Sequence, residues 1–320
     1  ASNSLYGGSY NMLKVLLPRL GITTTFVDPD DPKNFTDAVQ ENTRLFFAES
    51  LGNPKLDVLD LKGISRESKA AKVPFMVDST LATPALQNPI AYGVNIVIHS
   101  LTKYANGNGS TMGGVIVDAG NFDWSSGKFP EFTTPSDGYH GLVLHDVLGP
   151  AAYIAKVRIE GLRDLGAAIS PFNAFQIIQG LETLEIRMKK HSENALALAE
   201  WLEAHEDVAW VNYPGLKSSK YNELAKKYLP EGQSGLLAFG LKGGFDAGKT
   251  VADETKLFAL VANFGDSKSL VIHPASTTHQ QLTPEEQAST GVTPDLIRLS
   301  VGLENVEDLK ADLQQAFDKV

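Results

Sequence analysis

One stretch of the chain reads Val94-Asn95-Ile96-Val97-Ile98-His99-Ser100-Leu101-Thr102-Lys103-Tyr104. Its first five residues are mostly β-branched and apolar, which predicts a buried strand. Two hydroxyls and Lys103 follow directly. An amine that a buried sheet delivers into a pocket is desolvated, which lowers its pKa and makes it nucleophilic. The alternative for this stretch taken alone is a solvated lysine on a loop.

Two further apolar runs end in carboxylates, with Glu49 closing residues 43–50 and Asp78 closing residues 73–80. The apolar pattern predicts a short helix within residues 58–72, and a compact one fits within 84–92. Strands that alternate with helices predict a parallel sheet, and such sheets bind ligands at the carboxyl ends of their strands. We therefore expect Glu49, Asp78 and Lys103 to face one cleft.

A lysine and an acid in one cleft match the needs of pyridoxal phosphate. This cofactor requires a lysine for its Schiff base, an acid to keep its pyridine nitrogen protonated, and donors for its phosphate. Lys103 and Asp78 fill the first two roles, and the hydroxyls of Ser100 and Thr102 are candidate donors. A simple ion pair between Lys103 and Asp78 is the alternative.

Four motifs, in order along the chain, resemble the Cys/Met-metabolism family of pyridoxal-phosphate enzymes. They are Leu5-Tyr6-Gly7-Gly8-Ser9-Tyr10, Glu49-Ser50-Leu51-Gly52-Asn53-Pro54, Asp78-Ser79-Thr80 and Ser100-Leu101-Thr102-Lys103-Tyr104. The resemblance extends from Leu5 to the C-terminus. It implies an α/β fold of the fold type I (aspartate-aminotransferase-like) class, with a mainly parallel sheet domain and a smaller α+β C-terminal domain.

Within the family, the likeness is greatest to members that make homocysteine and acetate from O-acetylhomoserine and sulfide, a step of methionine biosynthesis. It rests on Gly113-Gly114-Val115-Ile116-Val117-Asp118, Gly120-Asn121-Phe122-Asp123-Trp124, Gly127-Lys128-Phe129-Pro130 and Tyr139-His140-Gly141. A cystathionine-forming or γ-eliminating reaction, and a non-catalytic protein of the same fold, are the alternatives.

The resemblance also implies roles for individual residues near the cofactor. Lys103 is the catalytic lysine, Asp78 pairs with the pyridine nitrogen, and Thr80 helps to hold the ring. Tyr6 stacks on the ring and assists proton transfer, and Asn53 donates toward the cofactor's phenolic oxygen and borders the substrate. On a structural reading, Tyr6 is a turn aromatic and Asn53, before a proline, is a turn residue.

Two C-terminal residues are expected to contact the substrate. In the predicted strand 296–301, alternation places Arg298 and Ser300 on the face opposite Ile297 and Leu299. A mid-strand arginine suits a carboxylate, and the resemblance assigns Arg298 to the substrate's α-carboxylate, with a surface arginine as the alternative. Ser269, in the stretch that runs to His279, is expected to help position the lysine or the carboxylate. His273 and His279 lack a third partner in the sequence, so we expect no metal site.

Composition narrows the class of protein. The 320 residues are 42% hydrophobic and 21% charged, and the net charge of −10 is the wrong sign for a general nucleic-acid binder. The sequence contains no cysteine, which excludes disulfides and thiolate metal sites and agrees with a reducing compartment. We expect no membrane segment and a cytoplasmic location.

The chain is expected to divide into a cofactor-binding α/β domain, residues 1–168, and an α+β substrate domain, residues 169–320. A helix is predicted to begin at Pro171 with Ser170 as its cap. We also predict a helix over 13–20, a strand over 22–27 and a helix over 247–261. The irregular stretch 118–149 is expected near the site entrance or on a partner subunit.

The resemblance carries two expectations about the whole assembly. The family normally has about another quarter of chain before the position of Ala1, with a phosphate-binding turn and a Tyr-x-Arg pair that reaches the neighbouring subunit's site. We therefore expect that an N-terminal part is missing from this sequence. The expected assembly is a homotetramer of dimers that share active sites.

Overall fold

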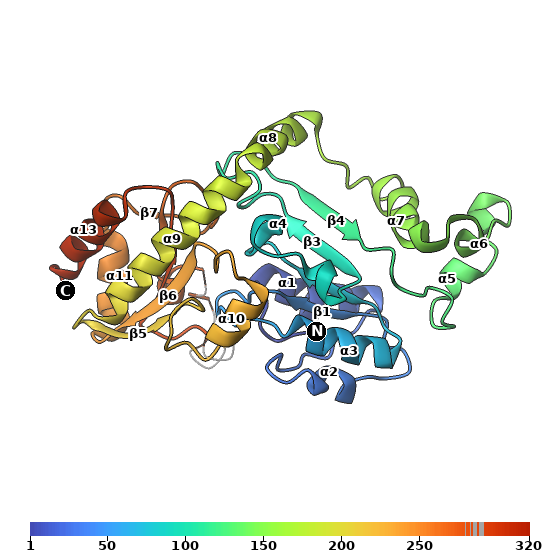
Figure 1. Ribbon diagram of the computed structural model, residues 1–320, viewed down its shortest axis with the longest axis horizontal. Helices are drawn as coiled ribbons and strands as arrows, with labels where there is room; N and C mark the ends of the chain where they lie inside the picture. The colour runs from blue at the N-terminus through green and yellow to red at the C-terminus, as the bar shows by residue number, and fades with distance from the viewer. Residues whose placement is uncertain (279, 282, 284–286, 288–290) are drawn as a thin grey trace.

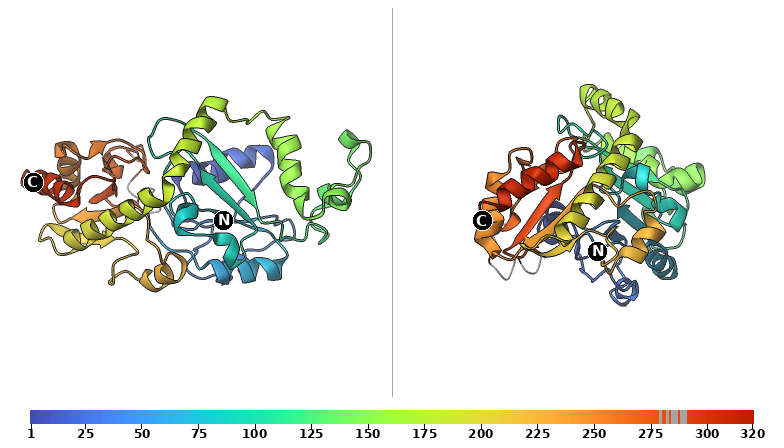
Figure 2. Two further views of the ribbon diagram at one scale, coloured as in Figure 1. Left: turned by 45° about the horizontal axis from the view of Figure 1, so that its top comes forward. Right: turned by 60° about the vertical axis from the view of Figure 1, so that its left-hand side comes forward.

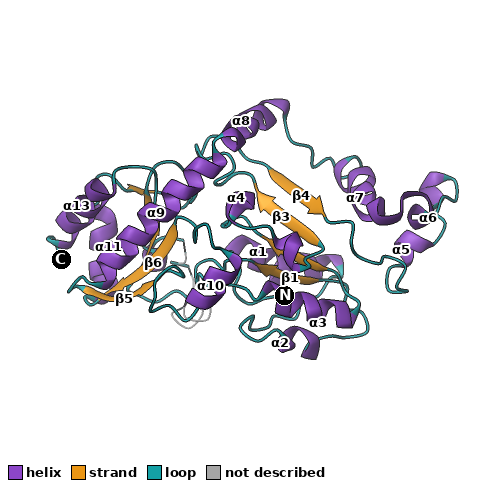
Figure 3. Ribbon diagram, viewed as in Figure 1, coloured by secondary structure: helices purple, strands orange, loops and turns teal. Residues whose placement is uncertain are grey.

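The structure is a computed structural model that describes residues 1–278, 280, 281, 283, 287 and 291–320. Its strands form two separate sheets, one in the middle of the molecule and the other toward the end that carries the C-terminus (Figure 3). None of the described helices is long and apolar enough to cross a membrane.

The first sheet has the order β1-β2-β3-β4. Its strands are β1 (Phe46–Glu49), β2 (Phe75–Asp78), β3 (Ile96–Ser100) and β4 (Gly114–Asp118). β1, β2 and β3 are parallel, as the sequence predicts, and β4 pairs antiparallel with β3. The three parallel strands therefore end at one edge of the sheet, where the predicted polar residues lie.

Helices connect the parallel strands, because parallel strands need crossover connections. α3 (Leu61–Ala71) lies between β1 and β2, and its buried residues include Leu61 and Ile64. Two short helices, α4 (Thr83–Leu86) and η3 (Pro89–Tyr92), occupy the predicted compact connection to β3. The remaining short elements before β1 are α1 (Gly7–Asn11), η1 (Met12–Leu16), η2 (Leu17–Leu20) and α2 (Lys33–Asp37).

The second sheet is mainly antiparallel, with the order β5-β6-β9-β8-β7. Its strands are β5 (Val208–Asn212), β6 (Leu236–Leu241), β7 (Ala259–Leu260), β8 (Leu270–Ile272) and β9 (Leu296–Ser300), with the short helix η7 (Pro274–Ser276) after β8. α9 (Leu184–Glu203), α11 (Gly244–Glu254) and α13 (Val306–Phe317) pack on it around a shared apolar core. This is the α+β arrangement expected for the C-terminal part.

Two helices connect the sheets along the chain. α8 (Pro171–Glu182) begins with Pro171, and the Ser170 side chain accepts a hydrogen bond from the Asn173 backbone N–H, so the predicted cap is confirmed. α9 then runs from the first sheet toward the second (Figure 1). The two parts share one apolar core, because residues of β1, β2, α9 and β6 belong to the same cluster.

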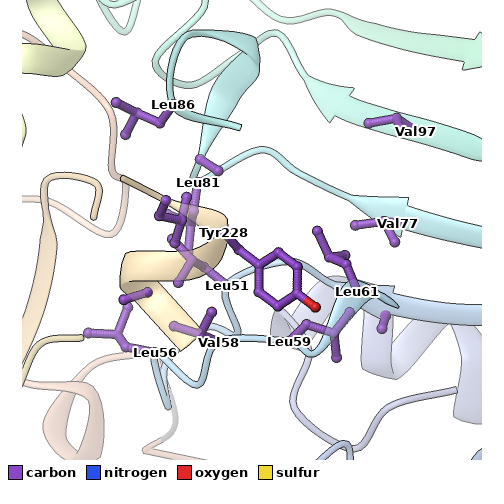
Figure 4. Packing of buried hydrophobic residues seen from close by; sticks show 14 of the residues in the cluster. Leu51, Leu56, Val58, Leu59, Leu61, Val77, Leu81, Leu86, Val97 and Tyr228 are labelled. Atoms are coloured by element: carbon purple, nitrogen blue, oxygen red, sulfur yellow. The ribbon is translucent and has the colours of Figure 1, made fainter. Parts of the chain in front are cut away.

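Tyr228 of α10 (Asn222–Tyr228) illustrates this shared core. Its ring lies among Leu51, Leu59 and Leu61 in Figure 4, and it is fully buried. Its hydroxyl donates a hydrogen bond to Asp60 and accepts one from the Lys62 backbone N–H. α10, which belongs to the C-terminal half of the sequence, is therefore fixed onto the first half.

Three secondary-structure predictions need correction. Residues 22–27 make a single bridge, between Val27 and Ser2, rather than a strand. A strand would need a neighbouring strand that pairs with several of these residues. Residues 13–20 are helical, but they form a π turn and a 3-10 turn that leave Leu16 and Leu20 exposed. The helix predicted over 247–261 ends at Glu254, and β7 follows it.

The stretch 118–149 does not lie at the entrance of the predicted cleft, so the first alternative for it is wrong, and its placement on a partner subunit stays a prediction. Trp124, Phe129 and Phe132 pack with Ile96, the first residue of β3, at the opposite edge of the sheet. The helices of this region are α5 (Pro130–Thr133), η4 (Asp137–Tyr139), α6 (Leu144–Leu148), η5 (Gly149–Ala151), α7 (Ala152–Lys156) and η6 (Val157–Leu162). They stand at the outer end of the molecule in both views of Figure 2.

A cavity of about 770 Å³ lies beside this stretch. Its lining includes Leu45, Pro74, Ile96, Trp124 and Tyr153, so it opens at the amino ends of the parallel strands. None of the residues predicted to form the site lines it.

Candidate active site

A smaller cavity lies at the carboxyl ends of the parallel strands. Glu49 ends β1, Asp78 ends β2, and the two are paired in register, so their side chains leave the same face of the sheet. The cavity is lined by Tyr6, Glu49, Leu51, Asn53, Asp78, Thr80, Leu81, Ser100, Lys103 and Phe264. The structure thus brings together the three residues that the sequence predicts to share a cleft.

Lys103 follows β3 by three residues, and two contacts from the C-terminal half hold its amine. Its Nζ donates a hydrogen bond to Asn263 Oδ1 and lies 4.6 Å from the centre of the Phe264 ring. Burial, and then the positive charge of Arg298, lower the pKa of Lys103. Both effects favour the neutral amine, which is the nucleophilic form.

Asp78 is held by the turn that follows it. Its Oδ1 accepts hydrogen bonds from the backbone N–H and the hydroxyl of Thr80. The Thr80 hydroxyl in turn accepts a bond of 2.8 Å from the backbone N–H of Ser100. Burial raises the pKa of Asp78, which disfavours its charged form. A cation beside Asp78 would oppose this effect and stabilise the carboxylate.

Tyr6 and Asn53 border the cavity from two turns. The Tyr6 side chain is 52% exposed, which leaves its ring accessible to a flat ligand. Its backbone N–H donates to Glu49 Oε1 over 2.6 Å. Asn53 is buried, and its Oδ1 accepts a hydrogen bond from Arg298.

Arg298 lies in β9 and reaches the first half of the chain. Its Nη1 is 3.2 Å from Asn53 Oδ1 and its Nη2 is 3.1 Å from the backbone carbonyl of Asn263. Its Nε is buried and has no partner, and none of the ion pairs among the described residues involves Arg298. Burial lowers the pKa of Arg298 to about 10. A guanidinium with a free donor and no carboxylate partner fits an incoming anion.

Two of the predicted residues have side chains bound elsewhere. Thr102 exchanges hydrogen bonds with the backbone of Gly113. Ser269 is fully buried, donates to Glu304 and accepts from the Gly302 backbone N–H. Neither side chain lines the cavity.

Sequence reasoning missed Asn263 and Phe264, the residues that contact Lys103 in place of Ser269. They directly precede Gly265, four positions before Ser269. An Asn-Phe-Gly triplet has no local signal of this role, because its partner amine is 160 positions away.

Gly265 allows the close approach of the two halves. Its φ of +81° is in the left-handed region, and a Cβ there would lie 2.6 Å from the Tyr104 backbone nitrogen and 3.2 Å from Lys103 Cα. Only a glycine accommodates both the backbone conformation and this contact. The loop that contains Asn263 is therefore packed directly on the Lys103 backbone.

The side chains present fit pyridoxal phosphate. One cavity is lined by an amine of lowered pKa, a carboxylate on a neighbouring strand and an accessible aromatic ring. Of the two hydroxyl residues predicted to bind the phosphate, Ser100 lines this cavity. No group of three or more His, Asp or Glu residues within the described part of the chain could hold a metal ion. His279 lies outside the described residues.

The fold and this cavity define a pyridoxal-phosphate enzyme of fold type I. Residues 1–318 match the family model described as "Cys/Met metabolism PLP-dependent enzyme". The chain belongs to this family, and its cofactor is pyridoxal phosphate.

Two similar proteins match nearly the whole of this chain. The chain is 52% identical over 329 residues to the O-acetyl-L-homoserine sulfhydrylase of Leptospira meyeri, covering 100% of this chain and 74% of that protein. It is 50% identical over 321 residues to the homocysteine synthase of Schizosaccharomyces pombe, covering 99% of this chain and 75% of that protein.

A solved structure is similar over nearly the whole chain. A crystal structure from Campylobacter jejuni, described as that of an O-acetylhomoserine (thiol)-lyase with a pyridoxyl-lysine phosphate, matches with a TM-score of 0.95 and 43% identity. The match covers 99% of this chain and 76% of that one.

Proposed function

We propose that the protein is a γ-replacement transferase that converts O-acetyl-L-homoserine and sulfide to L-homocysteine and acetate. The observation that carries the proposal is the meeting of Lys103 and Asp78 at one cavity, with Arg298 hydrogen-bonded to Asn53 of the same lining. The two relatives above, at 52% and 50% identity, support the choice of substrate.

Pyridoxal phosphate supplies an electron sink for the electrons released when a bond at the amino acid's α-carbon breaks. Lys103 is the proposed attachment point, and Asp78 is proposed to hold the ring nitrogen protonated. Tyr6 offers its ring as a stacking surface, with Asn53, Thr80 and Ser100 at the border of the same cavity.

The remaining steps are assigned to this chain's own side chains. Arg298 binds the substrate carboxylate, because its Nε is an unused donor. Lys103, whose lowered pKa favours the neutral amine, takes up the α-proton. Tyr6 is proposed to assist the proton transfer that accompanies departure of acetate. Acetate leaves with the electrons of the Cγ–O bond, and sulfide forms the new Cγ–S bond.

The experiment is an assay of the purified chain, supplied with pyridoxal phosphate, using three nucleophile conditions. With O-acetylhomoserine, sulfide should give homocysteine, whereas cysteine would give cystathionine and no nucleophile would give the keto acid of γ-elimination. Succinyl and phosphoryl esters of homoserine test the leaving group. Product only with cysteine or without a nucleophile would assign the neighbouring reactions, and no product under any condition would favour a non-catalytic protein.

Three further features belong to the proposal. We place the division between the cofactor-binding and substrate parts after residue 168. The proposed assembly is a homotetramer of dimers that share active sites. The proposed location is the cytoplasm. Light scattering on a size-exclusion column tests the assembly, since a monomer at micromolar concentration would contradict it.

A further inference from the structure

Glu49 is a buried carboxyl group in the cavity to which the proposed reaction assigns no step. Its side chain is 7% exposed, and it lies opposite Asp78 in the register of β1 and β2. Two carboxylates on one face of neighbouring strands repel each other when both are ionised. The pair is therefore expected to retain a proton.

The hydrogen bonds of Glu49 connect it to two turns. It accepts the backbone N–H of Tyr6 at 2.6 Å, and the backbone N–H of Asn53 lies close enough to oppose the rise of its pKa. Tyr6 and Asn53 are the residues that border the cofactor cavity from these turns. One carboxyl group at the end of β1 thus fixes the backbone on two sides of the cavity.

We propose that Glu49 is a positioning residue that works as a neutral carboxylic acid, holding Tyr6 and Asn53 in place while the negative charge of the site stays on Asp78. This inference rests on the proposed function for its relevance to catalysis. Its physical basis is the hydrogen bond from the Tyr6 N–H, the nearby Asn53 N–H and the paired register of the two acids. A charge on Asp78 alone is what a protonated ring nitrogen requires as a partner.

The electrostatic surroundings agree with a neutral Glu49. Burial raises its pKa well above the ordinary value, and the next contribution is the neighbouring Asp78. Asp57, which follows the Asn53 turn, adds to the increase, whereas the two backbone N–H groups oppose it. The acidic groups facing Glu49 therefore favour its protonated form.

The first test compares Glu49→Gln with Glu49→Ala, using amide hydrogen exchange of the chain without cofactor. Glutamine retains a neutral acceptor, and alanine removes it. We expect the Tyr6 amide to exchange about tenfold faster in Glu49→Ala, because one hydrogen bond is lost, and within about threefold of the parent rate in Glu49→Gln. Equal exchange in all three proteins would overturn the anchoring role.

The second test concerns the charge. A raised folded-state pKa means that the folded protein binds the proton more tightly, so the parent loses stability relative to Glu49→Gln as pH rises above about 4.5. Denaturant midpoints of both proteins between pH 5 and pH 9 should therefore diverge with increasing pH. A difference that does not change with pH would overturn the neutral state.

The third test measures the affinity for pyridoxal phosphate by titration of the cofactor-free proteins. Glu49→Gln should bind within about threefold of the parent, and Glu49→Ala about tenfold more weakly or worse. Asp312→Ala is the matched control, since Asp312 is a buried carboxyl that accepts backbone N–H groups of residues 256–258 far from the cavity. It should lower stability and leave the cofactor affinity unchanged.

The outcomes distinguish this inference from the proposed function. Hydrogen exchange and denaturation need neither cofactor nor substrate, so they decide the role of Glu49 even if the parent has no sulfhydrylase activity. If the parent is active and Glu49→Gln binds the cofactor as weakly as Glu49→Ala, the negative charge of Glu49 is required and the inference is wrong.

Discussion

The amine of Lys103 donates a hydrogen bond to the side-chain oxygen of Asn263, across 160 positions of sequence. The backbone carbonyl of Asn263 accepts a bond from Arg298. One residue therefore lies between the amine proposed to carry the cofactor and the guanidinium proposed to bind the substrate. The separation of the amine and the guanidinium is set by the loop before β8, which contains neither Lys103 nor Arg298.

Lys103→Ala should abolish turnover and covalent attachment of the cofactor. The amine is the only reacting group proposed for the α-proton, so we expect kcat to fall by about 10³-fold or more. The intact mass after borohydride reduction checks the attachment. Lys189→Ala removes an exposed lysine of α9 and is the control. A Lys103→Ala protein that still gains the mass of the reduced cofactor would rule out this assignment.

Asn263→Asp should shift the pH dependence of activity toward higher pH. A carboxylate beside Lys103 favours the ammonium form, which raises the pKa of the amine from its lowered value. The acidic limb of the kcat/KM profile should therefore move up by about one pH unit. Asn42→Asp adds the same charge at an exposed position before β1 and should leave the limb in place. An unmoved limb in Asn263→Asp would show that this contact does not control the titration.

Arg298→Lys should weaken substrate binding more than it slows the reaction. Lysine keeps a positive charge but loses the planar fork that contacts Asn53 and the Asn263 carbonyl. We expect KM for O-acetylhomoserine to rise about tenfold, and about 30-fold or more in Arg298→Met, where the charge is also lost. Steady-state kinetics provide the check, and an unchanged KM in Arg298→Met would argue against carboxylate binding by this residue.

Gly265→Ala should lower the stability of the protein and also displace the backbone at Lys103 and Tyr104. The left-handed φ costs about 1 kcal/mol for alanine, and the contact of the new Cβ with the Tyr104 nitrogen adds about 1–3 kcal/mol.

Gly21→Ala is the matched control for that substitution. Gly21 has nearly the same φ of +80°, but no atom lies within 4 Å of the place that an alanine Cβ would take. Gly21→Ala should lower the free energy of unfolding only by the backbone contribution, about 1 kcal/mol. Urea denaturation compares the two variants, and equal losses of stability would mean that the backbone of Lys103 moves away without cost.

The sequence predicted the parallel half of the fold because its information is local. Short apolar runs that end in Glu49, Asp78 and Ser100 define three strands, and the helices between them require parallel pairing. Since parallel strands end at one edge, the meeting of Glu49, Asp78 and Lys103 followed from chain direction alone. The strand of Arg298 was predicted in the same way, from its alternation.

The sequence pattern did not predict which surfaces of these elements pack against one another. The pattern around residues 13–20 predicted a helix, but Leu16 and Leu20 remain exposed, because periodicity does not say whether another element covers a helix face. The aromatic stretch 118–149 was expected at the site entrance or on a partner subunit, and the cluster around Trp124 lies at the amino ends of the strands, away from that entrance.

By itself, then, the sequence determined which residues end the strands and which edge of the sheet they share, since both follow from residue pattern and chain direction. Only the tertiary structure decided that Asn263, rather than Ser269, contacts the Lys103 amine, and that Arg298 pairs with no carboxylate among the described residues. These facts depend on how two sheets pack across one core. That packing is set by shape and volume over the whole chain, and no local pattern encodes it.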